Sequence, residues 1–507
     1  MSYLILVVGV LGLSHTRVPT ESRPGHVAML AGLYEDPSAI TAGWSDNPVQ
    51  FDHVLNRSEH SWAWGSPDIV PMFSRGSAAG RVTTDHYTKE MENFAADNLS
   101  SLDTWVFDRV ETFFAKARDN TTLQMMLRQD GNIFFLHLLG CDTNGHVHKP
   151  HSEQYQDNIN VVDEGVKRMV EVFENYFRND GRTAYLLTSD HGMTDWGSHG
   201  TGMDVETVTP LAVWGAGVKR LDSNIGARAR FNGWDGFSDQ YRVEVRQADL
   251  APLMATLVGV SIPVNNVGVL PVDILDLHPN HQVEAMISQA DQLLAQYLAL
   301  QQAHKEVYLP NIFYRPFAKL SESDIETAKL NIRNIAKQGH HKEALRNCNR
   351  FIDVIMEGIE YYQRYQKSIL LFLIKISFIG CAMTNMAKLC SNGRKTNSIM
   401  RRNSATIFTI FSLAVSFVNF CWFCQRLPYH FLLYYISPLF IWSKLLHYLV
   451  TRSFNQVKIS KLNILMVIQI VAVLMILRES FFDRRWLSVG FLTLLLHPVV
   501  NSQIVPR

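Results

Sequence analysis

The sequence predicts an α/β head built on a central, mostly parallel sheet, followed by a helical stalk and an all-α transmembrane bundle of about five helices. Apolar, strand-like runs alternate with polar helical stretches over residues 14–280. Residues 281–366 have helical character, and long apolar runs fill 367–507. A chain of 507 residues is also expected to hold more than one domain, since about 150 residues is a usual domain length.

The distribution of charge separates the front of the chain from its tail. From Lys367 onward there are two acids, Glu479 and Asp483, against 16 lysines and arginines. Residues 1–366 hold the other 45 acids and 31 bases, so the net charge of zero is a cancellation. This predicts a soluble acidic part and a membrane-embedded basic part. The 6 cysteines are too scattered for a disulfide framework or a cysteine-rich zinc site.

The first segment, residues 1–13, is almost wholly apolar. Its apolar core is shorter than the roughly 20 residues that a spanning helix needs. It also lacks the basic start of a signal peptide. The segment is therefore compatible with a weak signal, with a buried strand or with a fragmentary start.

Three runs in the predicted head read clearly as strands. They cover residues 132–139, 183–188 and 209–218. Their aromatic and β-branched residues, with helical stretches between them, favour a mostly parallel sheet that has helices on both faces. In such sheets ligands bind beyond the carboxyl ends of the strands, and polar clusters stand at those ends in this chain.

The stalk and the tail are expected to be helical. A capping box formed by Ser323 and Glu326 is predicted to open the second stalk helix. The loop after the first apolar run of the tail is rich in lysine and arginine, and positive loops stay cytosolic. The head is then expected on the lumenal or exterior side. The apolar runs lie near 368–387, 404–424, 428–450, 462–477 and 486–500.

Three glycosylation motifs agree with this orientation. Asn56, Asn98 and Asn120 each begin an Asn-x-Ser/Thr motif, and all three lie in the head. The motif is short and occurs by chance, so each one alone says little. Their absence from the tail adds to the charge argument.

Two carboxylates and three imidazoles stand in loops after the predicted strands. Neutral imidazole and carboxylate are ligands that zinc accepts. Five such groups exceed the needs of one metal ion, and two neighbouring ions can hold the entering and leaving oxygens of a phosphoryl displacement. A single histidine is as readily an ordinary surface or core residue, so only the whole set predicts a metal site. Its members are Asp142, His146, Asp190, His191 and His199.

The early segment offers several candidate nucleophiles. Ser14, Thr16, Thr20 and Ser22 all carry hydroxyls there, and the residues alone do not choose among them. A hydroxyl is a weak nucleophile at its ordinary pKa, and coordination to a metal activates it. Thr20 also precedes Pro24 at a possible helix start, where free backbone N–H groups favour a phosphate.

Segments 14–26, 142–146 and 188–200 resemble the alkaline-phosphatase superfamily. More narrowly, they are similar to the GPI ethanolamine phosphate transferases that act on the first mannose of a GPI precursor. The similarity runs from about Gly12 to Asp276. The stretch Thr20 to His26 carries the narrower likeness, whereas the metal-ligand motifs belong to the superfamily.

The resemblance implies two zinc ions. One would be held by Asp142, His146 and His199, and the other by Asp190 and His191 with the oxygen of Thr20. Thr20 would attack the phosphorus of phosphatidylethanolamine, and a mannose hydroxyl of the GPI precursor would then accept the phosphoethanolamine.

The resemblance also implies a setting and some supporting residues. The protein is expected in the endoplasmic reticulum membrane, multi-pass and with a lumenal head, among membrane lipids and without a nucleic-acid partner. Arg23 and His26 are expected either to touch phosphate or glycan or to support the fold. His148 and Asp195 are expected to be structural neighbours of the metal ligands.

The sequence departs from the family at one motif. The family has a spanning segment and then a strand that ends in Asp-Gly-x-Arg-x-Asp, whereas the first acid here is Glu21. The second zinc would therefore have three protein ligands, and the sheet would lack its first strand. This favours a chain cut at both ends, and it leaves the activity of the chain open.

Two other functions remain alternatives. A phosphodiesterase or sulfatase-like hydrolase would use the same ligands, although no sulfatase modification motif is evident. A non-catalytic membrane protein that keeps the head as a binding or folding module is the other alternative.

Overall fold

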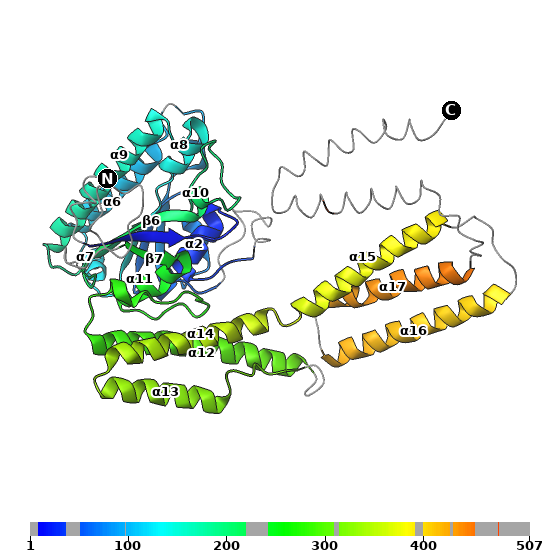
Figure 1. Cartoon of the computed structure of the whole chain (residues 1–507). Helices are drawn as coiled ribbons and strands as arrows, with labels where there is room; N and C mark the ends of the chain where they lie inside the picture. Colours follow the sequence, from blue (N-terminus) through cyan, green and yellow to red (C-terminus); the bar gives the residue numbers. More distant parts are fainter. Residues whose placement is uncertain are drawn as a thin grey trace. The chain divides into compact units, whose positions relative to one another are not determined.

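The computed structural model describes residues 9–36, 51–96, 98–219, 242–308, 314–390, 399–425, 429–451 and 475. The chain divides into two compact units. The first comprises Met1–Glu306 and Pro310–Tyr365, and the second comprises Val307–Leu309 and Gln366–Arg507. Figure 1 shows the α/β head and helices α12–α14 of the first unit, and helices α15–α17 of the second.

The described strands of the head form two sheets. One has the order β5-β6-β1-β7, and the other has the order β3-β2-β4. Strand β2 is parallel to β3 and β4, and β1 is parallel to β7, but β6 is antiparallel to β1 and β5. The bounds are β1 Gly9–His15, β2 Ser61–Gly65, β3 Val82–His86, β4 Ile133–Leu136, β5 Ala184–Thr188, β6 Val208–Gly215 and β7 Arg242–Arg246.

The three strands predicted most clearly are present as β4, β5 and β6. The expectation of a mostly parallel sheet holds in part, because the described sheets are mixed. Strand β6 makes its sheet mixed, because it is antiparallel to both of its neighbours, β5 and β1. Composition indicates how deeply a strand is buried, but it does not encode the direction in which the strand runs.

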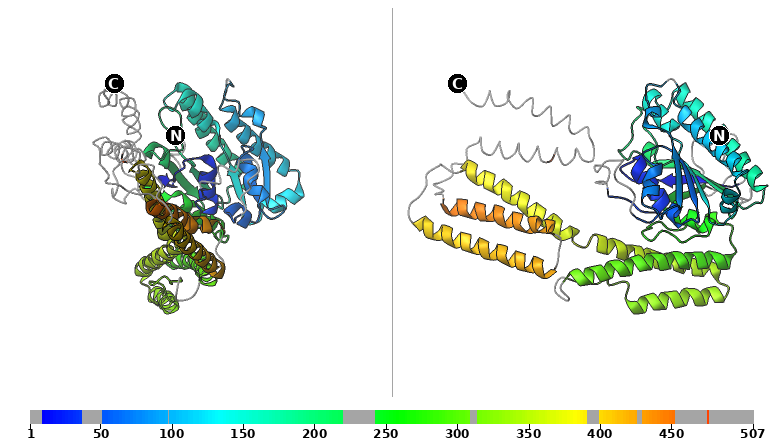
Figure 2. Two further views of the ribbon diagram at one scale, coloured as in Figure 1. Left: turned by 90° about the vertical axis from the view of Figure 1, so that its right-hand side faces the viewer. Right: turned by 180° about the vertical axis from the view of Figure 1, so that it is seen from behind.

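Helices cover both faces of the sheet that contains β4. Side chains alternate along the strand: Phe134 packs with Phe114 and Phe173, while Ile133 and Phe135 pack on the opposite side against another cluster. Figure 2 gives two further views of these layers. The head helices are α2 Ser22–Ala31, α4 Val54–Arg57, α5 Val70–Arg75, α6 Ser101–Ala117, α7 Thr121–Leu127, α8 Gly140–His148, α9 Glu153–Phe177, α10 Asp204–Thr207 and α11 Leu250–Val258, with short 3-10 turns at Lys89–Met91, Gln247–Asp249 and Val272–Ile274.

The predicted stalk is helical and packs on the head. It consists of α12 Pro279–Val307, α13 Glu322–Lys337 and α14 His341–Gln363. One continuous apolar cluster joins Val10 and Leu211 of the sheet to Ile355 of α14. The capping-box prediction was wrong in position. The side chain of Ser321 accepts a hydrogen bond from the backbone of Asp324, and the side chain of Asp324 accepts one from the backbone of Ser321. The box therefore lies two residues earlier than Ser323 and Glu326, and Ser323 falls inside the helix.

The tail contains three described helices, α15 Lys367–Cys390, α16 Ile399–Gln425 and α17 His430–Thr451. They match the first three predicted apolar runs. Within the described residues, two helical stretches are long and apolar enough to cross a membrane, one in His341–Lys388 and one at Thr406–Phe423. The all-α bundle of about five spans is thus not confirmed. The runs at 462–477 and 486–500 lie outside the described residues, apart from position 475.

Candidate active site

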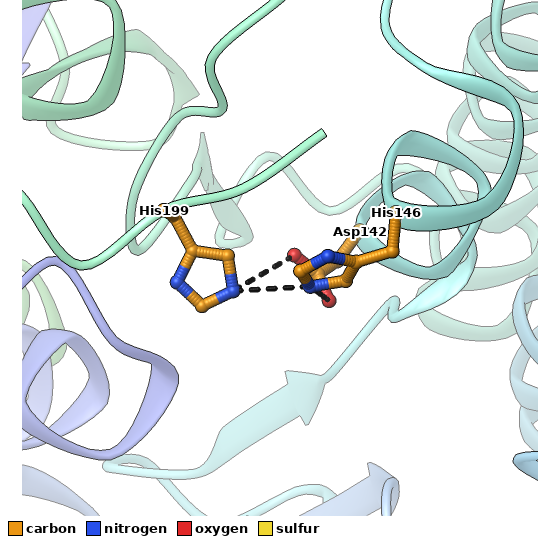
Figure 3. Close-up of side chains that lie close together, drawn as sticks. All are labelled: Asp142, His146 and His199. Atoms are coloured by element: carbon orange, nitrogen blue, oxygen red, sulfur yellow. Dashed lines mark hydrogen bonds and ion pairs between the residues drawn. The ribbon is translucent and has the colours of Figure 1, made fainter. Parts of the chain in front are cut away.

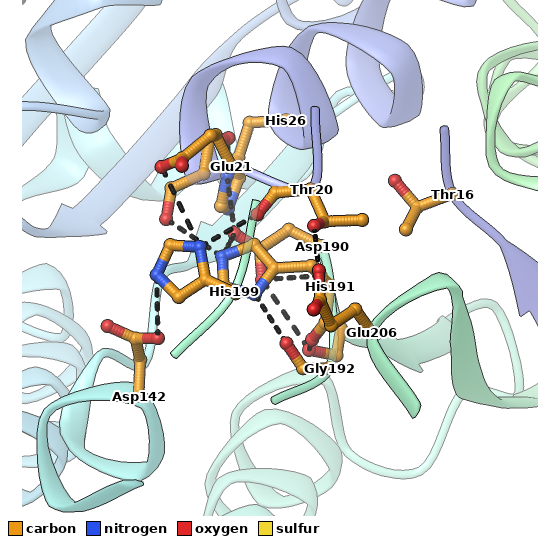
Figure 4. A network of polar contacts seen from close by, with 12 residues as sticks. Thr16, Thr20, Glu21, His26, Asp142, Asp190, His191, Gly192, His199 and Glu206 are labelled. Carbon is orange, nitrogen blue, oxygen red and sulfur yellow. Dashed lines mark hydrogen bonds and ion pairs between the residues drawn. The ribbon is translucent and has the colours of Figure 1, made fainter. Parts of the chain in front are cut away.

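Three segments that are far apart in the chain meet at one end of the head. The segment after β1 carries Thr20, helix α8 after β4 carries Asp142 and His146, and the loop after β5 carries Asp190 and the histidines that follow it. This confirms that polar clusters gather at the carboxyl ends of these strands. Figure 4 shows the resulting network of polar contacts.

Asp142, His146 and His199 form a cluster with the geometry of a metal site. One ligand atom from each residue lies within 4.8 Å of the other two (Figure 3). Nε2 of His146 is 3.4 Å from Oδ2 of Asp142 and 3.1 Å from Nε2 of His199. The spacing of Asp142 and His146 places them one turn apart on the same face of α8.

Backbone carbonyls determine which ring nitrogen carries the proton in the neutral histidines of the site. Nδ1 of His146 faces the carbonyl of Gly197 at 3.0 Å, and Nδ1 of His199 faces the carbonyl of Thr20 at 2.7 Å. A carbonyl oxygen only accepts, so each Nδ1 carries the proton and donates it. In the neutral ring, Nε2 is then left with a free lone pair, which is the arrangement that metal-binding histidines use.

These residues fit a divalent cation. The Nε2 lone pairs of His146 and His199 face each other at 3.1 Å, which is unfavourable unless a proton or a cation lies between them. Oδ1 of Asp142 is buried and, among the described residues, accepts no hydrogen bond. Burial also raises the pKa of Asp142, and the neighbouring imidazoles oppose this only in part. A bound cation would satisfy all three groups.

Asp190 and His191 lie beside this cluster. Oδ2 of Asp190 is 3.5 Å from both Nε2 of His191 and Nδ1 of His26, and the ring of His191 stacks on that of His199 with centroids 4.1 Å apart. Nδ1 of His191 faces the Gly192 carbonyl at 3.0 Å, so its Nε2 is also free to act as a ligand.

The charges of this pair depend on each other. Burial alone would raise the pKa of Asp190, but His191, His26 and His137 outweigh it and hold that pKa well below its usual range. Burial lowers the pKa of His191, but Asp190 and Asp142 outweigh this effect and raise it. Asp190 is therefore a carboxylate at neutral pH, as a metal ligand must be.

The hydroxyl of Thr20 is fully buried between two partners. It donates a hydrogen bond of 2.5 Å to Glu206 and accepts one of 2.7 Å from the backbone N–H of Gly200. Glu206 also accepts hydrogen bonds from both backbone and side chain of Thr201 and from Gly202. Burial would raise the pKa of Glu206, but these donors lower it to about 2, so it is a carboxylate.

Glu206 was not among the residues singled out from the sequence. It lies 186 positions from Thr20 in the chain and stands between Val205 and Thr207, in no metal-ligand pattern. Its only sequence signal is that it closely follows the Gly197-to-Gly200 loop.

The rival hydroxyls have different surroundings. Ser14 lies inside β1 and is fully buried, and Thr16 donates a hydrogen bond of 2.7 Å to Gln247. Ser22 is the rival nearest the ligands, since its Oγ lies 3.4 Å from Nε2 of His191. Thr20 and Ser22 are therefore the two hydroxyls that the structure brings to the site.

Arg23 and His26, which the sequence left between a ligand-contacting and a fold-supporting role, have different surroundings. Arg23 is buried and forms a two-pronged ion pair with Glu35 at 2.7 and 2.8 Å, which supports the fold-supporting interpretation. His26 lies under the site, where its Nδ1 faces the Ser22 carbonyl at 2.7 Å and Asp190 at 3.5 Å.

The remaining candidates lie further out. Asp195 pairs with His151 at the surface, 3.1 Å away. Asn98 and Asn120 are exposed, Asn56 is partly exposed, and the side chain of Asn120 also caps α7. Glycosylation at these three positions stays a prediction.

Two family models match the chain. Residues 8–251 match the type I phosphodiesterase / nucleotide pyrophosphatase family. This range includes all residues of the candidate site. Residues 357–507 match the phosphatidylinositolglycan class N (PIG-N) family. The fold and the metal-type cluster thus place the head among the phosphoester-processing enzymes of the alkaline-phosphatase type.

Curated relatives narrow this class. The chain is 45% identical to GPI ethanolamine phosphate transferase 1 of Mus musculus over 383 residues, which are 74% of this chain and 41% of that protein. It is 42% identical to the Homo sapiens protein of that name over 465 residues, 90% of this chain and 49% of that protein. The Neurospora crassa protein is 42% identical over 87% of this chain and 44% of its own length.

The chain is thus similar to the GPI ethanolamine phosphate transferase 1 proteins over most of its own length. It spans half or less of the length of the curated relatives it matches.

Proposed function

We propose that this chain transfers phosphoethanolamine from phosphatidylethanolamine to the first mannose of a GPI-anchor precursor. The observation that carries the proposal is the metal-type cluster of Asp142, His146 and His199 beside the buried hydroxyl of Thr20. The names of the relatives, GPI ethanolamine phosphate transferase 1, give the transferred group and the GPI acceptor class. The phosphatidylethanolamine donor and the mannose acceptor follow from the family resemblance of segments 14–26, 142–146 and 188–200.

Two divalent cations, which we take to be zinc, would be held by this site. The first would bind Asp142, His146 and His199, and the second would bind Asp190 and His191 next to Thr20. When bound, they would neutralise the phosphoryl oxygens and make a neighbouring hydroxyl a better nucleophile. The Nε2 lone pairs of His146, His191 and His199 support this assignment, because a backbone carbonyl faces Nδ1 of each ring and leaves Nε2 as the ligand atom.

Thr20 is the proposed nucleophile. Its Oγ1 forms a bond to phosphorus while the bond from phosphorus to the diacylglycerol oxygen breaks, which leaves phosphoethanolamine on Thr20. The mannose hydroxyl then attacks the same phosphorus, and Oγ1 of Thr20 leaves. The proton of the Thr20 hydroxyl ends on the diacylglycerol oxygen, and the proton of the mannose hydroxyl ends on Oγ1 of Thr20, so both steps balance. Glu206 has a pKa of about 2 and is a weak base, so its part is to orient the Thr20 hydroxyl.

The proposed setting is the endoplasmic reticulum membrane with the head in the lumen. Both proposed substrates are membrane lipids, and two helical stretches of the described chain are long and apolar enough to cross a membrane. The head carries all three glycosylation motifs, and the basic loop after α15 favours a cytosolic position for that loop.

A water-using phosphodiesterase is the second candidate. The family model that matches the head carries that activity in its name, and the same ligands would serve it. The two candidates differ in the acceptor of the phosphoryl group, which the ligands do not determine.

The test is metal content and transfer measured on the same purified chain. Zinc would be counted per protein, and phosphoethanolamine would be followed from labelled phosphatidylethanolamine to a mannosyl acceptor or to water. Thr20→Ala, Ser22→Ala and His146→Ala are the informative variants, with His281→Ala of helix α12, an exposed side chain outside the site, as the control.

We expect close to two zinc ions per protein. Transfer to mannose should be abolished by Thr20→Ala and preserved by Ser22→Ala. Zinc should be lost in His146→Ala but not in His281→Ala. Release of phosphoethanolamine to water alone would establish the phosphodiesterase instead. Absence of zinc and of turnover would leave a non-catalytic membrane protein.

A further inference from the structure

Gln247 is a fully buried side chain that contacts the segment carrying Asp190. It stands directly after β7, at the start of the 3-10 turn Gln247–Asp249. Its Nε2 donates a hydrogen bond of 2.7 Å to the carbonyl of Asp190 and one of 3.3 Å to the carbonyl of Ser189. Carbonyl oxygens only accept, so the NH2 group of the amide faces them. A single side chain thus satisfies two neighbouring carbonyls.

These two carbonyls lie on either side of the Cα atom of Asp190. The carbonyl of Ser189 belongs to the peptide group before this atom, and the carbonyl of Asp190 belongs to the peptide group after it. Because peptide groups are planar, fixing both carbonyls fixes the direction in which the Cβ of Asp190 points. The second peptide group also carries the N–H of His191, which donates to Oδ1 of Asp190 at 3.0 Å. The pairing of β5 with β6 ends at Thr188, so that ladder does not hold these carbonyls.

The other end of the Gln247 amide is bound to the segment that carries the proposed nucleophile. Its Oε1 accepts a hydrogen bond of 2.7 Å from the hydroxyl of Thr16. The backbone N–H of Thr16 donates to the carbonyl of Thr207 at 2.9 Å, and Thr207 follows Glu206, the partner of Thr20. The amide therefore bridges the nucleophile segment and the ligand segment after β5.

The turn that presents Gln247 is held by hydrogen bonds of its own. The carboxylate of Asp249 accepts from the backbone and the side chain of Arg246 at 2.9 and 2.8 Å. It also accepts from the backbone N–H of Val269 at 2.7 Å. A buried amide that is bound at both ends, on a turn fixed in this way, has its orientation set before any ligand arrives.

We propose that Gln247 is a positioning residue for the second cation, which aims Asp190 at the place where that cation would bind. The inference rests on the two-cation site proposed above. Groups that hold the ligands of a metal from behind typically change its affinity by about 10- to 100-fold. In the described part of the chain, the hydrogen bonds of Gln247 do not reach Asp142 or His146, which lie in helix α8. The first cation should therefore keep its affinity when Gln247 is replaced.

The test compares Gln247→Met with Gln289→Met in the full chain in lipid nanodiscs. Methionine has a similar length to glutamine but donates no hydrogen bond. Gln289 of α12 is the matched control, because it is also fully buried and bonds to another side chain, that of Gln292. Thr16→Val is a second variant, which removes only the donor to Oε1 of Gln247. Zinc binding to the chelator-treated protein is measured by calorimetric titration, and amide hydrogen exchange of residues 189–193 is measured without metal by mass spectrometry.

In Gln247→Met we expect the affinity for one of the two zinc ions to fall by about 10- to 100-fold while the other affinity is unchanged. Exchange in 189–193 should become about tenfold faster. Gln289→Met should change neither quantity, and Thr16→Val should change both in the same direction. Equal effects of Gln247→Met and Gln289→Met would mean a general loss of stability and would overturn the proposal.

The outcomes separate the role of Gln247 from the two-cation site itself. Two zinc ions in the wild type with unchanged affinities in Gln247→Met would overturn the role of Gln247 alone. Fewer than two zinc ions in the wild type would overturn the two-cation site and the role of Gln247 together. If Gln247→Met does not fold, Thr16→Val decides the question, and unchanged affinity and exchange in that variant would overturn the proposal.

Discussion

The hydroxyl of Thr20 and the carboxylate of Glu206 are joined by a hydrogen bond of 2.5 Å, in a part of the head where both side chains are fully buried. Charge-assisted hydrogen bonds of this kind are short and strong. Because the Gly200 N–H donates to the same hydroxyl, the oxygen of Thr20 is held from two sides. Any change in Glu206 is therefore expected to move the proposed nucleophile.

Glu206→Gln tests this arrangement. The variant keeps the shape of the side chain but loses the charge that orients the Thr20 hydroxyl, and small misplacements of a reacting group cost up to about 100-fold in rate. We expect kcat for transfer to fall by about 10- to 100-fold with zinc content unchanged. The control is Thr201→Val, which removes a different donor from Glu206 and leaves the hydrogen bond of Thr20 in place. Equal losses in both variants would contradict a specific role in orienting Thr20.

Metal binding should stabilise the head measurably. A cation relieves the 3.1 Å contact between the Nε2 atoms of His146 and His199, and a ligand at 100 times its dissociation constant stabilises a protein by about 2.7 kcal/mol. We expect zinc to raise the Tm of the chelator-treated protein, and His199→Ala to abolish the rise. His151→Ala is the matched control, since its side chain is exposed at the surface. A rise that survives His199→Ala would place the metal elsewhere.

The stability of the head should fall as pH rises toward neutrality through one buried carboxyl. Burial raises the pKa of Asp103 to about 6, although Asn158 and the Gly140 N–H partly oppose this. The unfolded value is near 3.8, so the folded protein binds the extra proton between the two values. The stabilising contribution is therefore complete below about pH 4 and lost by about pH 6.

The measurement is urea unfolding at pH 4.5 and pH 7 for the wild type and Asp103→Asn. Through Asp103, the free energy of unfolding of the wild type should fall by about 2 kcal/mol from pH 4.5 to pH 7, and Asp103→Asn should lack this contribution. An unchanged difference would show that the carboxyl of Asp103 is already ionised at the lower pH.

Gly25→Ala should disturb Asp190 directly. A Cβ at this position of α2 would lie 2.9 Å from Cβ of Asp190 and 3.0 Å from its carbonyl oxygen. Since backbone yields less readily than a flexible side chain, we expect a loss of about 1–3 kcal/mol in the free energy of unfolding together with weaker metal binding. Calorimetric titration with zinc checks the second effect. Normal zinc affinity in a destabilised variant would show that Asp190 tolerates the shift.

Much of the head could be predicted from sequence because its signals are local. Apolar and aromatic runs marked β4, β5 and β6, and residues that stand right after strands marked the metal cluster. The family resemblance predicted that His199 would lie with Asp142 and His146 around one metal ion. The spacing of these residues in the sequence does not predict this grouping.

The misses at the candidate site and in the sheet are non-local, whereas the capping box was missed by two residues within one turn. Glu206 meets Thr20 only after the chain has folded, so no spacing rule marks it. The sequence left Arg23 between two roles, and the structure supports the fold-supporting one, because its guanidinium pairs with Glu35. The antiparallel direction of β6 depends on how the chain returns to the sheet, and composition does not record that path.

The position of β1 has a consequence for synthesis. Its His15 pairs with Val208 of β6 and with Arg246 of β7, so its partners lie some two hundred residues later in the chain. At translation rates of about 5–20 residues per second, the first strand waits roughly 10–40 s before its neighbours exist. During that interval it is an apolar, unpaired segment. A chaperone that shields extended segments is thus a natural need of the nascent chain, and slower translation would lengthen its exposure.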